Sequence, residues 1–338
     1  MCANQVSVSI IVPAYNAEDH LARSLPAIKK SDYPYYELIV VDDHSTDGTA
    51  ETARKYADIL ISMRIKGAPG KARNKGADKG RGSILFYLDA DVEISPDSIS
   101  RIVKFLEENP DIGAVFGSYD DNPHCKDFFS QYKNLFHHFV HQNAKTEAST
   151  FWAGCGAIRK KVFLEAGGFP ERYSSPAIED VEMGYKLKEQ AIEIRLVKEL
   201  QVKHLKKWNF LNLLKTDIFQ RAVPWARLSL EKGLPYDLNF KLSDRISGIL
   251  ACLTPISLIV IWWYVPCVFI SIMFAGALFY MNRKLYRFYL LKKGWKFAIL
   301  SVFLHWFYLF YSSITLISAT GIFMVKKILS KWREAFIP

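Results

Sequence analysis

Two long stretches near the carboxyl end carry almost no charge, and they restrict the possible folds more than any other feature. Residues 246–281 contain no charged side chain, and residues 297–325 contain only His305 as a titrating group. Each stretch exceeds the roughly 20 apolar residues that cross a bilayer as one helix. The alternative, a buried soluble core, is poor because so much apolar chain leaves little polar surface for water. The sequence therefore predicts a membrane protein.

The first stretch is too long for one crossing, because a single helix of this length would extend about 54 Å. Interfacial aromatic residues and Pro266 lie at its middle, in Trp-Trp-Tyr-Val-Pro at 262–266. This favours a hairpin of two short helices over 246–281, followed by a third helix over 297–325. A break in that third segment at 312–313 or 320–321 would instead give a fourth crossing with two short halves.

Basic residues between the apolar stretches predict the orientation. The segment 282–296 is rich in lysine and arginine and contains no acid, so we expect it to be a cytoplasmic loop. The apolar run 6–12 is too short for a signal peptide. We therefore expect a multi-pass protein of the cell membrane with a cytoplasmic catalytic part. The tail conflicts with three crossings, because its cations also favour the cytoplasm: Lys326, Lys327, Lys331 and Arg333.

The first 120 residues alternate apolar strands with helical segments. Apolar runs at 6–12, 37–41 and 84–88 are followed by Asn16, by Asp42-Asp43 and by Asp89-Ala90-Asp91. This alternation predicts an α/β fold with a mostly parallel sheet, which binds ligands beyond the carboxyl ends of its strands. Asn16 is expected to cap a helix that runs to residue 31.

Asp89 and Asp91 are two residues apart at the end of a strand, so both side chains point to the same side. Such a pair of carboxylates suits Mg²⁺ or Mn²⁺ and leaves positions open for phosphate oxygens. Two solvated acids in a turn are the simpler alternative. The sequence favours a divalent cation as cofactor.

Four motifs resemble those of family 2 glycosyltransferases with the GT-A fold. They are Val-Pro-Ala-Tyr-Asn at 12–16, Val-Asp-Asp at 41–43, Asp-Ala-Asp at 89–91 and Glu-Asp at 179–180. The resemblance covers about residues 5–225. It implies a GT-A-type sheet within a catalytic domain at 1–208 and transfer from a UDP- or GDP-linked sugar with inversion. We expect an interfacial amphipathic segment at 209–245 and a transmembrane region at 246–338.

The resemblance also implies a nucleotide site. The turn at 13–16 would border the base and ribose, and Asp43 would accept a hydrogen bond from the base. Arg73 lies on a helix that flanks the nucleotide-sugar, where a cation suits a diphosphate. Each feature has a purely structural alternative. The turn at 13–16 is then only a strand-to-helix turn, Asp43 is only a helix cap, and the helix of Arg73 only presents a solvated face. The implied nucleotide-binding residues are Pro13, Ala14, Tyr15, Asn16, Asp42, Asp43, Arg73 and Asp89.

The same resemblance assigns the metal ligands and a catalytic acid–base group. Asp89 and Asp91 would hold the metal, and His204 would complete its shell unless it is only an interfacial residue. Asp180 is expected in the first turn of a helix, which stabilises its ionised form. It would take the proton from an acceptor hydroxyl. With a phosphate acceptor it would position that group, and a helix cap is the alternative.

The acceptor would contact a glycine-punctuated loop and an amphipathic helix at 209–227. In that helix, the segment 221–225 resembles the Gln/Arg-x-x-Arg-Trp motif of membrane-bound polysaccharide and glycolipid synthases. Pro224 replaces the second arginine, which disfavours processive polymerisation. Trp225 stacks on an acceptor or only anchors the helix at the lipid surface. The expected acceptor residues are Trp152, Gly154, Gly156, Glu179, Arg221 and Trp225.

Composition narrows the function further. The net charge of +10 suits an anionic leaflet and phosphorylated ligands, and no aromatic–basic stripe indicates a nucleic-acid groove. The five cysteines lack a metal-binding spacing. We expect transfer of one sugar to a polyprenyl phosphate or glycolipid, or alternatively to a growing polysaccharide. A nucleotidyltransferase would need a glycine- and lysine-rich loop after the first strand, and a non-catalytic membrane scaffold would bind no nucleotide.

Overall fold

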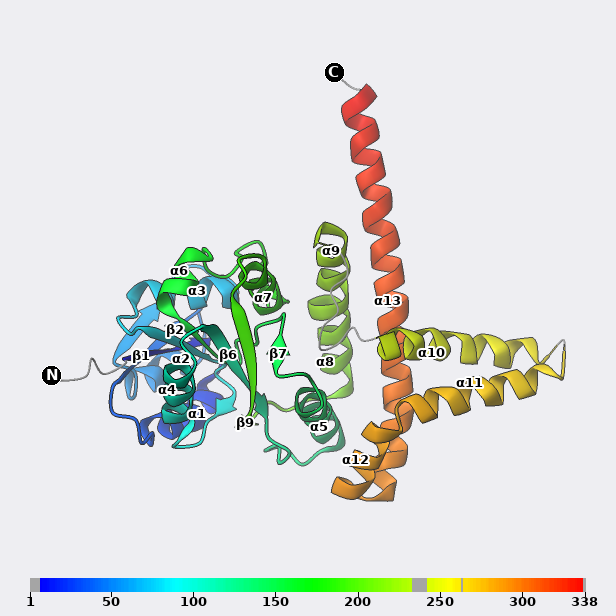
Figure 1. The fold of residues 1–338 in the computed structure, drawn as a ribbon, viewed down its shortest axis with the longest axis horizontal. Coiled ribbons are helices and arrows are strands. Elements are labelled where there is room, and N and C mark those ends of the chain that lie inside the picture. Colours follow the sequence, from blue (N-terminus) through cyan, green and yellow to red (C-terminus); the bar gives the residue numbers. More distant parts are fainter. Residues whose placement is uncertain (1–6, 233–241, 263, 337–338) are drawn as a thin grey trace. The chain divides into compact units, whose positions relative to one another are not determined.

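The computed structural model describes residues 7–232, 242–262 and 264–336 (Figure 1). The chain divides into two compact units, Met1–Trp208 and Asn209–Pro338. The first unit contains the α/β fold, and the second is helical.

The described part of the first unit contains one mixed sheet of nine strands, in the order β3-β2-β1-β4-β8-β6-β9-β5 with β7 (Glu147–Ala148) beside β9. The parallel prediction is confirmed for the amino-terminal half, whereas the other half is mixed. The parallel strands are β1 (Val8–Ala14), β2 (Tyr36–Asp42), β3 (Ile59–Ser62) and β4 (Ile84–Leu88). The remaining strands are β5 (Val92–Glu93), β6 (Ile112–Tyr119), β8 (Cys155–Arg159) and β9 (Glu193–His204).

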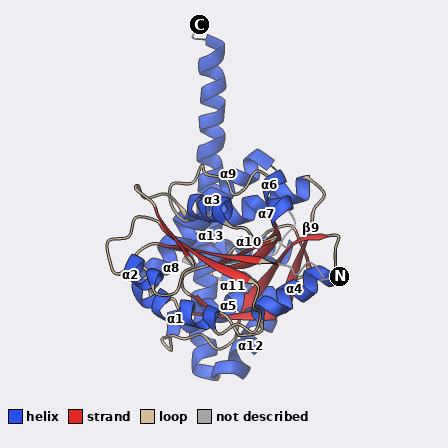
Figure 2. Cartoon of the chain, turned by 90° about the vertical axis from the view of Figure 1, so that its left-hand side faces the viewer, coloured by secondary structure: helices blue, strands red, loops and turns tan. Residues whose placement is uncertain are grey.

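Helices cover both faces of this sheet (Figure 2). One face carries α1 (Glu18–Lys29) and α4 (Ser98–Glu108), whose buried apolar residues join those of the strands in one core. Each fully buried large apolar side chain there contributes about 1.5–3 kcal/mol. The opposite face carries α3 (Pro69–Lys79), α6 (Lys160–Glu165) and α7 (Glu179–Glu189). The remaining helices of the unit are α2 (Thr49–Arg54), which packs on α1, and α5 (Phe128–Gln142), which packs on β6 and β9.

The start of α1 differs from the expectation. Asn16 has a positive φ of 46° and precedes the helix, so the prediction that it caps α1 is wrong. The cap position is Ala17, whose N–H donates to Thr49 Oγ1 at 2.8 Å. Asn16 Oδ1 instead accepts the N–H of Thr46 at 2.9 Å. The turn after β1 is therefore fastened to the loop after β2.

The second unit begins with a continuous helical segment of three parts: α8 (Phe210–Lys215), the π-helix η1 (Thr216–Ala222) and α9 (Val223–Lys232). Leu211 and Phe219 are exposed on it, whereas Leu213 and Asp217 are buried. The buried Asp217 carboxylate accepts a hydrogen bond of 2.8 Å from the Tyr311 hydroxyl. Whether this segment lies at a membrane interface stays a prediction.

The expected hairpin is formed by α10 (Leu242–Val260) and α11 (Cys267–Met281), which lie side by side (Figure 1). The Ser271 hydroxyl donates to the Ser257 hydroxyl at 2.8 Å. The turn between them includes Pro266, and Trp263 of the predicted turn lies outside the described residues.

One prediction for the following segments is wrong, because the basic segment expected as a loop forms the helix α12 (Arg283–Lys293), bent by 65° from α11. The third apolar segment forms one helix as expected, α13 (Trp295–Phe336), and the alternative break at 312–313 or 320–321 does not occur. Within the described ranges, Leu242–Val260 and Trp295–Leu329 are long and apolar enough to cross a membrane. A third crossing requires α11 and α12 to count as one bent span.

Candidate active site

The predicted site residues of the amino-terminal half gather at the carboxyl ends of three parallel strands. Ala14 at the end of β1 pairs with Asp42 at the end of β2, and β4 leads directly into Asp89. Because these ends lie at one edge of the sheet, residues far apart in the sequence are brought together.

Asp42 and Asp43 are both about 95% buried, and each is oriented by the backbone around it. Asp42 Oδ1 accepts the N–H of Ser45 at 3.0 Å, and Asp43 Oδ1 accepts the N–H of Gly67 at 2.6 Å. Burial raises the pKa of Asp43, although the Gly67 N–H and the nearby Lys66 oppose the shift. Asp43 thus connects β2 to the loop that precedes α3.

Tyr15 and Lys66 form a contact that the sequence did not indicate. The Lys66 ammonium lies 3.5 Å from the centre of the Tyr15 ring, which is 42% exposed. A cation so close to an aromatic face is attracted by the ring electrons. The turn at 13–16 and the loop at 63–68 therefore meet beside Asp43.

Arg73 is buried between two carboxylates from distant parts of the chain. Its Nη2 lies 2.7 Å from Asp89 Oδ1, and its Nη1 lies 2.8 Å from Glu179 Oε1. Burial opposes the charge, but Asp89 and Glu179 raise the pKa of Arg73 further above its usual range. Burial also raises the pKa of Asp89 despite Arg73. The guanidinium thus ties α3 to the end of β4 and to the start of α7.

Asp91 and His204 face each other because β5 pairs with the end of β9, where Val92 is opposite His204. His204 Nε2 lies 3.5 Å from Asp91 Oδ2. Burial opposes the charge of Asp91, but His204 lowers its pKa well below the usual range. Tyr119, at the end of β6, stacks on the His204 ring with centroids 4.3 Å apart. Sequence reasoning missed Tyr119, although its place at a strand end is the signal that could have found it.

These residues fit a divalent cation in part. Asp91 and His204 are close enough for both to bind one ion at about 2.1 Å, and this oxygen–imidazole pair suits Mn²⁺. Within the described residues, no third histidine, cysteine or acid joins them in a preformed cluster. Asp89 is paired with Arg73 instead. One or two protein ligands are sufficient where substrate phosphates supply the other positions.

Asp180 lies in the first turn of α7, next to Glu179. Its Oδ1 accepts the N–H of Val181 at 2.8 Å, and its Oδ2 accepts the N–H of Ala153 at 3.3 Å. Burial and the Glu179 carboxylate raise the pKa of Asp180 to about 7, against the opposing charge of Arg73. A carboxylate with this pKa can exchange a proton at neutral pH.

The amino-terminal half of the chain matches a known family. Residues 9–167 match the family described as Glycosyl transferase family 2. This part of the chain is a family 2 glycosyltransferase domain. The family resemblance inferred from the four motifs is thereby confirmed.

Individual relatives each match about a third of this chain. The putative teichuronic acid biosynthesis glycosyltransferase TuaG of Bacillus subtilis is 30% identical over 106 residues, 30% of this chain and 42% of TuaG. The Escherichia coli enzyme WfgD, a UDP-Glc:alpha-D-GlcNAc-diphosphoundecaprenol beta-1,3-glucosyltransferase, is 34% identical over 118 residues, 33% of this chain and 46% of WfgD. The chain thus covers less than half of either relative.

A solved structure with a similar fold is that of the mannosyltransferase PcManGT from Pyrobaculum calidifontis, in complex with GDP-Man and Mn²⁺. It aligns with a TM-score of 0.57 and 18% identity over 94% of this chain and 87% of that one. At this identity the likeness concerns the fold alone, and it agrees with the expected GT-A-type α/β architecture.

The residues predicted to contact the acceptor are distributed over both units. Trp152 folds over Gly154, where a Cβ would lie 2.6 Å from the indole, and Gly156 is buried within β8. These two glycines therefore let the neighbouring residues Trp152 and Phe151 lie close to their backbone.

The other predicted acceptor residues lie elsewhere. Glu179 binds Arg73 and the N–H of Ala177. Arg221 and Trp225 belong to the second unit. Their acceptor roles stay predictions.

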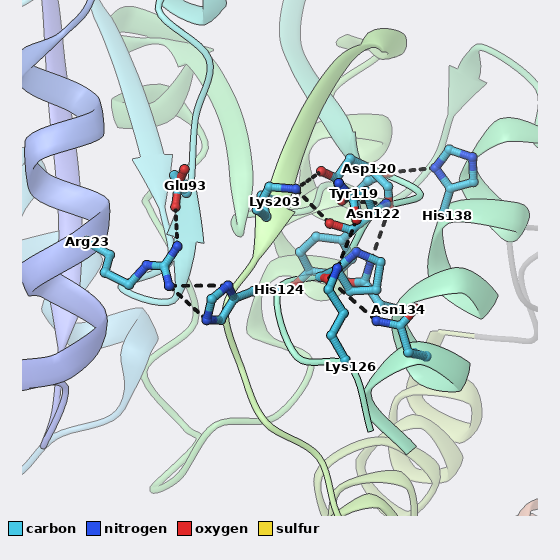
Figure 3. A network of polar contacts seen from close by, with 12 residues as sticks. Arg23, Glu93, Tyr119, Asp120, Asn122, His124, Lys126, Asn134, His138 and Lys203 are labelled. Carbon is cyan, nitrogen blue, oxygen red and sulfur yellow. Dashed lines mark hydrogen bonds and ion pairs between the residues drawn. The ribbon is translucent and has the colours of Figure 1, made fainter. Parts of the chain in front are cut away.

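A polar network fastens the loop that follows β6 of the glycosyltransferase domain (Figure 3). Lys203 of β9 lies 2.8 Å from Asp120 Oδ2 and donates to the Asn122 carbonyl. Arg23 of α1 contacts the His124 ring at 2.8 Å and Glu93 of β5 at 3.4 Å. Because Lys203 precedes His204, the network also fixes the end of β9 beside Asp91.

Proposed function

We propose that this chain transfers a single sugar from a nucleoside-diphosphate sugar to a membrane-lipid acceptor. The observation that carries the proposal is the gathering of Asp43, Arg73, Asp89, Asp91 and Asp180 at one sheet edge within a family 2 glycosyltransferase domain. Donor binding and proton transfer both need groups at such an edge.

The donor nucleotide would lie against the turn at 13–16. The Gly67 N–H orients the Asp43 carboxylate, which would accept a hydrogen bond from a uracil or guanine ring. Tyr15 and Lys66 would border that ring. Asp89 would face the ribose, and the Arg73 guanidinium keeps this carboxylate in place.

Asp91 and His204 would hold a divalent cation together with the donor phosphates. The ion, when bound, neutralises charge on the departing diphosphate. Tyr119 stacks on His204 and Lys203 fastens the preceding position, so the imidazole is already oriented toward Asp91. The Mn²⁺ and GDP-Man in the PcManGT complex support this assignment by analogy.

Asp180 would act on the acceptor. Its pKa of about 7 lets it accept a proton from an attacking hydroxyl, and Ala153 and Val181 fix its two oxygens. A single displacement of this kind inverts the anomeric carbon. A phosphate acceptor would bring no proton, and Asp180 would then position it.

The lipid nature of the acceptor is supported by the helical unit and by one relative. Leu242–Val260 and Trp295–Leu329 are apolar enough to cross a bilayer, and WfgD is named for a diphosphoundecaprenol-linked acceptor. We place the catalytic unit on the cytoplasmic side, where nucleotide-sugars are made. TuaG is named for teichuronic acid biosynthesis, so a polysaccharide acceptor is the alternative.

The test uses the purified full-length chain in a mild detergent, with UDP- and GDP-sugars, Mn²⁺ and a bacterial lipid extract. Mass spectrometry of the lipid fraction should show one added hexose or N-acetylhexosamine. Asp91→Asn should abolish the product, with the exposed Asp111→Asn as the matched control. Nucleotide-sugar turnover with a polysaccharide product only would favour the alternative acceptor. If neither product forms and no nucleotide binds, the result would favour a non-catalytic membrane scaffold.

A further inference from the structure

The helix α12 and the turn that follows it present a dense group of exposed cations. Within 282–296 the chain contains no acidic residue, and every basic side chain of the segment is exposed. We name this group the α12 basic surface: Arg283, Lys284, Arg287, Lys292, Lys293 and Lys296.

The opposite side of α12 is fixed. Leu285, Tyr286 and Tyr289 are buried, and α12 packs on α13. The Tyr286 hydroxyl accepts a hydrogen bond from Trp306 Nε1 at 3.0 Å and lies 3.0 Å from His305 Nδ1. Because α13 covers this side of α12, the cations on the other side point away from α13.

The charge of α12 limits where it lies if the helical unit crosses a membrane. A lysine or arginine at the middle of a bilayer is strongly unfavourable, so the exposed cations of α12 disfavour a position in the hydrocarbon. The helix is bent by 65° from α11, which is only about 22 Å long and too short to cross the roughly 30 Å hydrocarbon layer by itself. The charge of the α12 basic surface therefore favours the headgroup level.

Aromatic residues flank α12 at both ends, as at a membrane interface. The Arg283 guanidinium stacks 3.9 Å from the ring centre of Tyr280, and Lys296 lies 5.6 Å from that of Trp295. Tyr280 and Trp295 are both exposed, and the outward Leu291 is 74% exposed. This combination of cations, aromatic rings and leucine matches a helix that lies in the interface.

Two cations of this surface lie where a helix normally favours negative charge. Arg283 and Lys284 occupy the first turn of α12, where the helix dipole favours acids. An anionic surface facing this turn would remove the conflict. The placement supports an external anionic partner rather than a role in helix stability.

We propose that the α12 basic surface binds the headgroup phosphates of anionic phospholipids. The proposal rests on the membrane location assigned under the proposed function, but it does not depend on glycosyl transfer. Its partner is a lipid layer, since the cations are spread along the exposed side of α12 and are interspersed with exposed apolar side chains.

The experiment measures lipid retention, which is independent of enzymatic activity. The full-length chain in a neutral detergent is mixed with equal amounts of phosphatidylglycerol and phosphatidylcholine, and the bound lipids are counted by native mass spectrometry. Each cation near a membrane surface strengthens binding about fivefold. We expect the wild-type chain to retain phosphatidylglycerol over phosphatidylcholine by at least about tenfold. The variant R283Q/K284Q/R287Q should lose most of this preference.

The matched control neutralises three exposed lysines of the first unit, as K79Q/K104Q/K161Q, and should keep the wild-type preference. R283K/R287K keeps the charge and should also keep it, which covers the case in which the neutral variant does not fold. Equal retention of both lipids by the wild-type chain would overturn the proposal. So would an unchanged preference in the neutral variant, or loss of phosphatidylglycerol to millimolar inorganic phosphate alone.

Discussion

The guanidinium of Arg73 lies 2.8 Å from the carboxylate of Glu179, a residue 106 positions later in the chain. Both side chains are almost completely buried, and the same guanidinium holds Asp89 at 2.7 Å. One cation thus connects the donor side of the candidate site with the helix that carries Asp180.

Replacing Arg73 by methionine should destabilise the first unit strongly. The change leaves the buried Glu179 carboxylate without its cation, a loss that costs about 3–5 kcal/mol in comparable sites. Thermal or denaturant unfolding measures the effect. The control is Arg101→Met, which removes an exposed pair with Asp97 and should cost less than about 1 kcal/mol. Equal losses in the two variants would contradict a structural role for the buried pair.

Metal dependence should reside in Asp91 and His204. Asp91→Asn removes the oxygen that faces His204, so we expect transfer to fall by at least about 100-fold. His204→Ala should raise the Mn²⁺ concentration needed for half-maximal rate, as measured in a metal titration of the transfer assay. Asp111→Asn, an exposed change, should match the wild-type titration. A His204→Ala titration identical to the wild type would exclude His204 from the metal shell.

The rate of transfer to a hydroxyl acceptor should rise with pH and level off above about 7. Asp180 must be ionised to accept a proton, and burial with Glu179 and Asp89 raises its pKa to about 7 while Arg73 opposes the shift. Initial rates over pH 5–9 at saturating donor give the profile. A rate that does not change across this range would remove Asp180 as the base and favour a phosphate acceptor.

The same pKa shift predicts an opposite effect on stability. Because the pKa of Asp180 is higher in the folded chain than in the unfolded chain, the folded state binds more protons between about pH 4 and 7. Its ionisation therefore lowers the free energy of unfolding as pH rises through this window. Asp180→Asn should raise the melting temperature at pH 8 relative to the wild type, and the gain should vanish near pH 4.

Gly76 should not tolerate even a methyl group. A Cβ at this position in α3 would lie 2.4 Å from Ile11 Cγ2, so Gly76→Ala must displace α3 from β1 and should cost about 1–3 kcal/mol. A Cβ at Gly276 in α11 would meet no described residue within 4 Å, so Gly276→Ala should be neutral or stabilising. Melting temperatures of the two alanine variants test the difference in sign.

Sequence reasoning succeeded where a local pattern determines a local structure. The apolar runs that end in polar residues predicted β1, β2 and β4 and the edge at which Asp43, Asp89 and Asp91 lie. The long uncharged stretch around Pro266 predicted the pair α10 and α11. In these cases the periodicity and the turn residues act on neighbouring positions, so no tertiary information is needed.

It failed where distant contacts decide. The strand β8 was missed because its sequence, Cys-Gly-Ala-Ile-Arg, is a strand only by pairing with β4 and β6. The helix α12 was expected as a loop because its many charged residues obscure, in the sequence, the apolar positions that pack on α13. The bridge from Arg73 to Glu179 and the stacking of Tyr119 on His204 likewise join residues that no local spacing relates.

The uninterrupted length of α13 limits how it can sit in a bilayer. Its uncharged part, 297–325, is about 44 Å long, whereas the hydrocarbon layer is about 30 Å thick. An upright helix would leave roughly 14 Å of apolar side chains among headgroups and water. This mismatch disappears when the helix tilts steeply or when the surrounding membrane is thick. Bilayer thickness should therefore alter the inclination of α13.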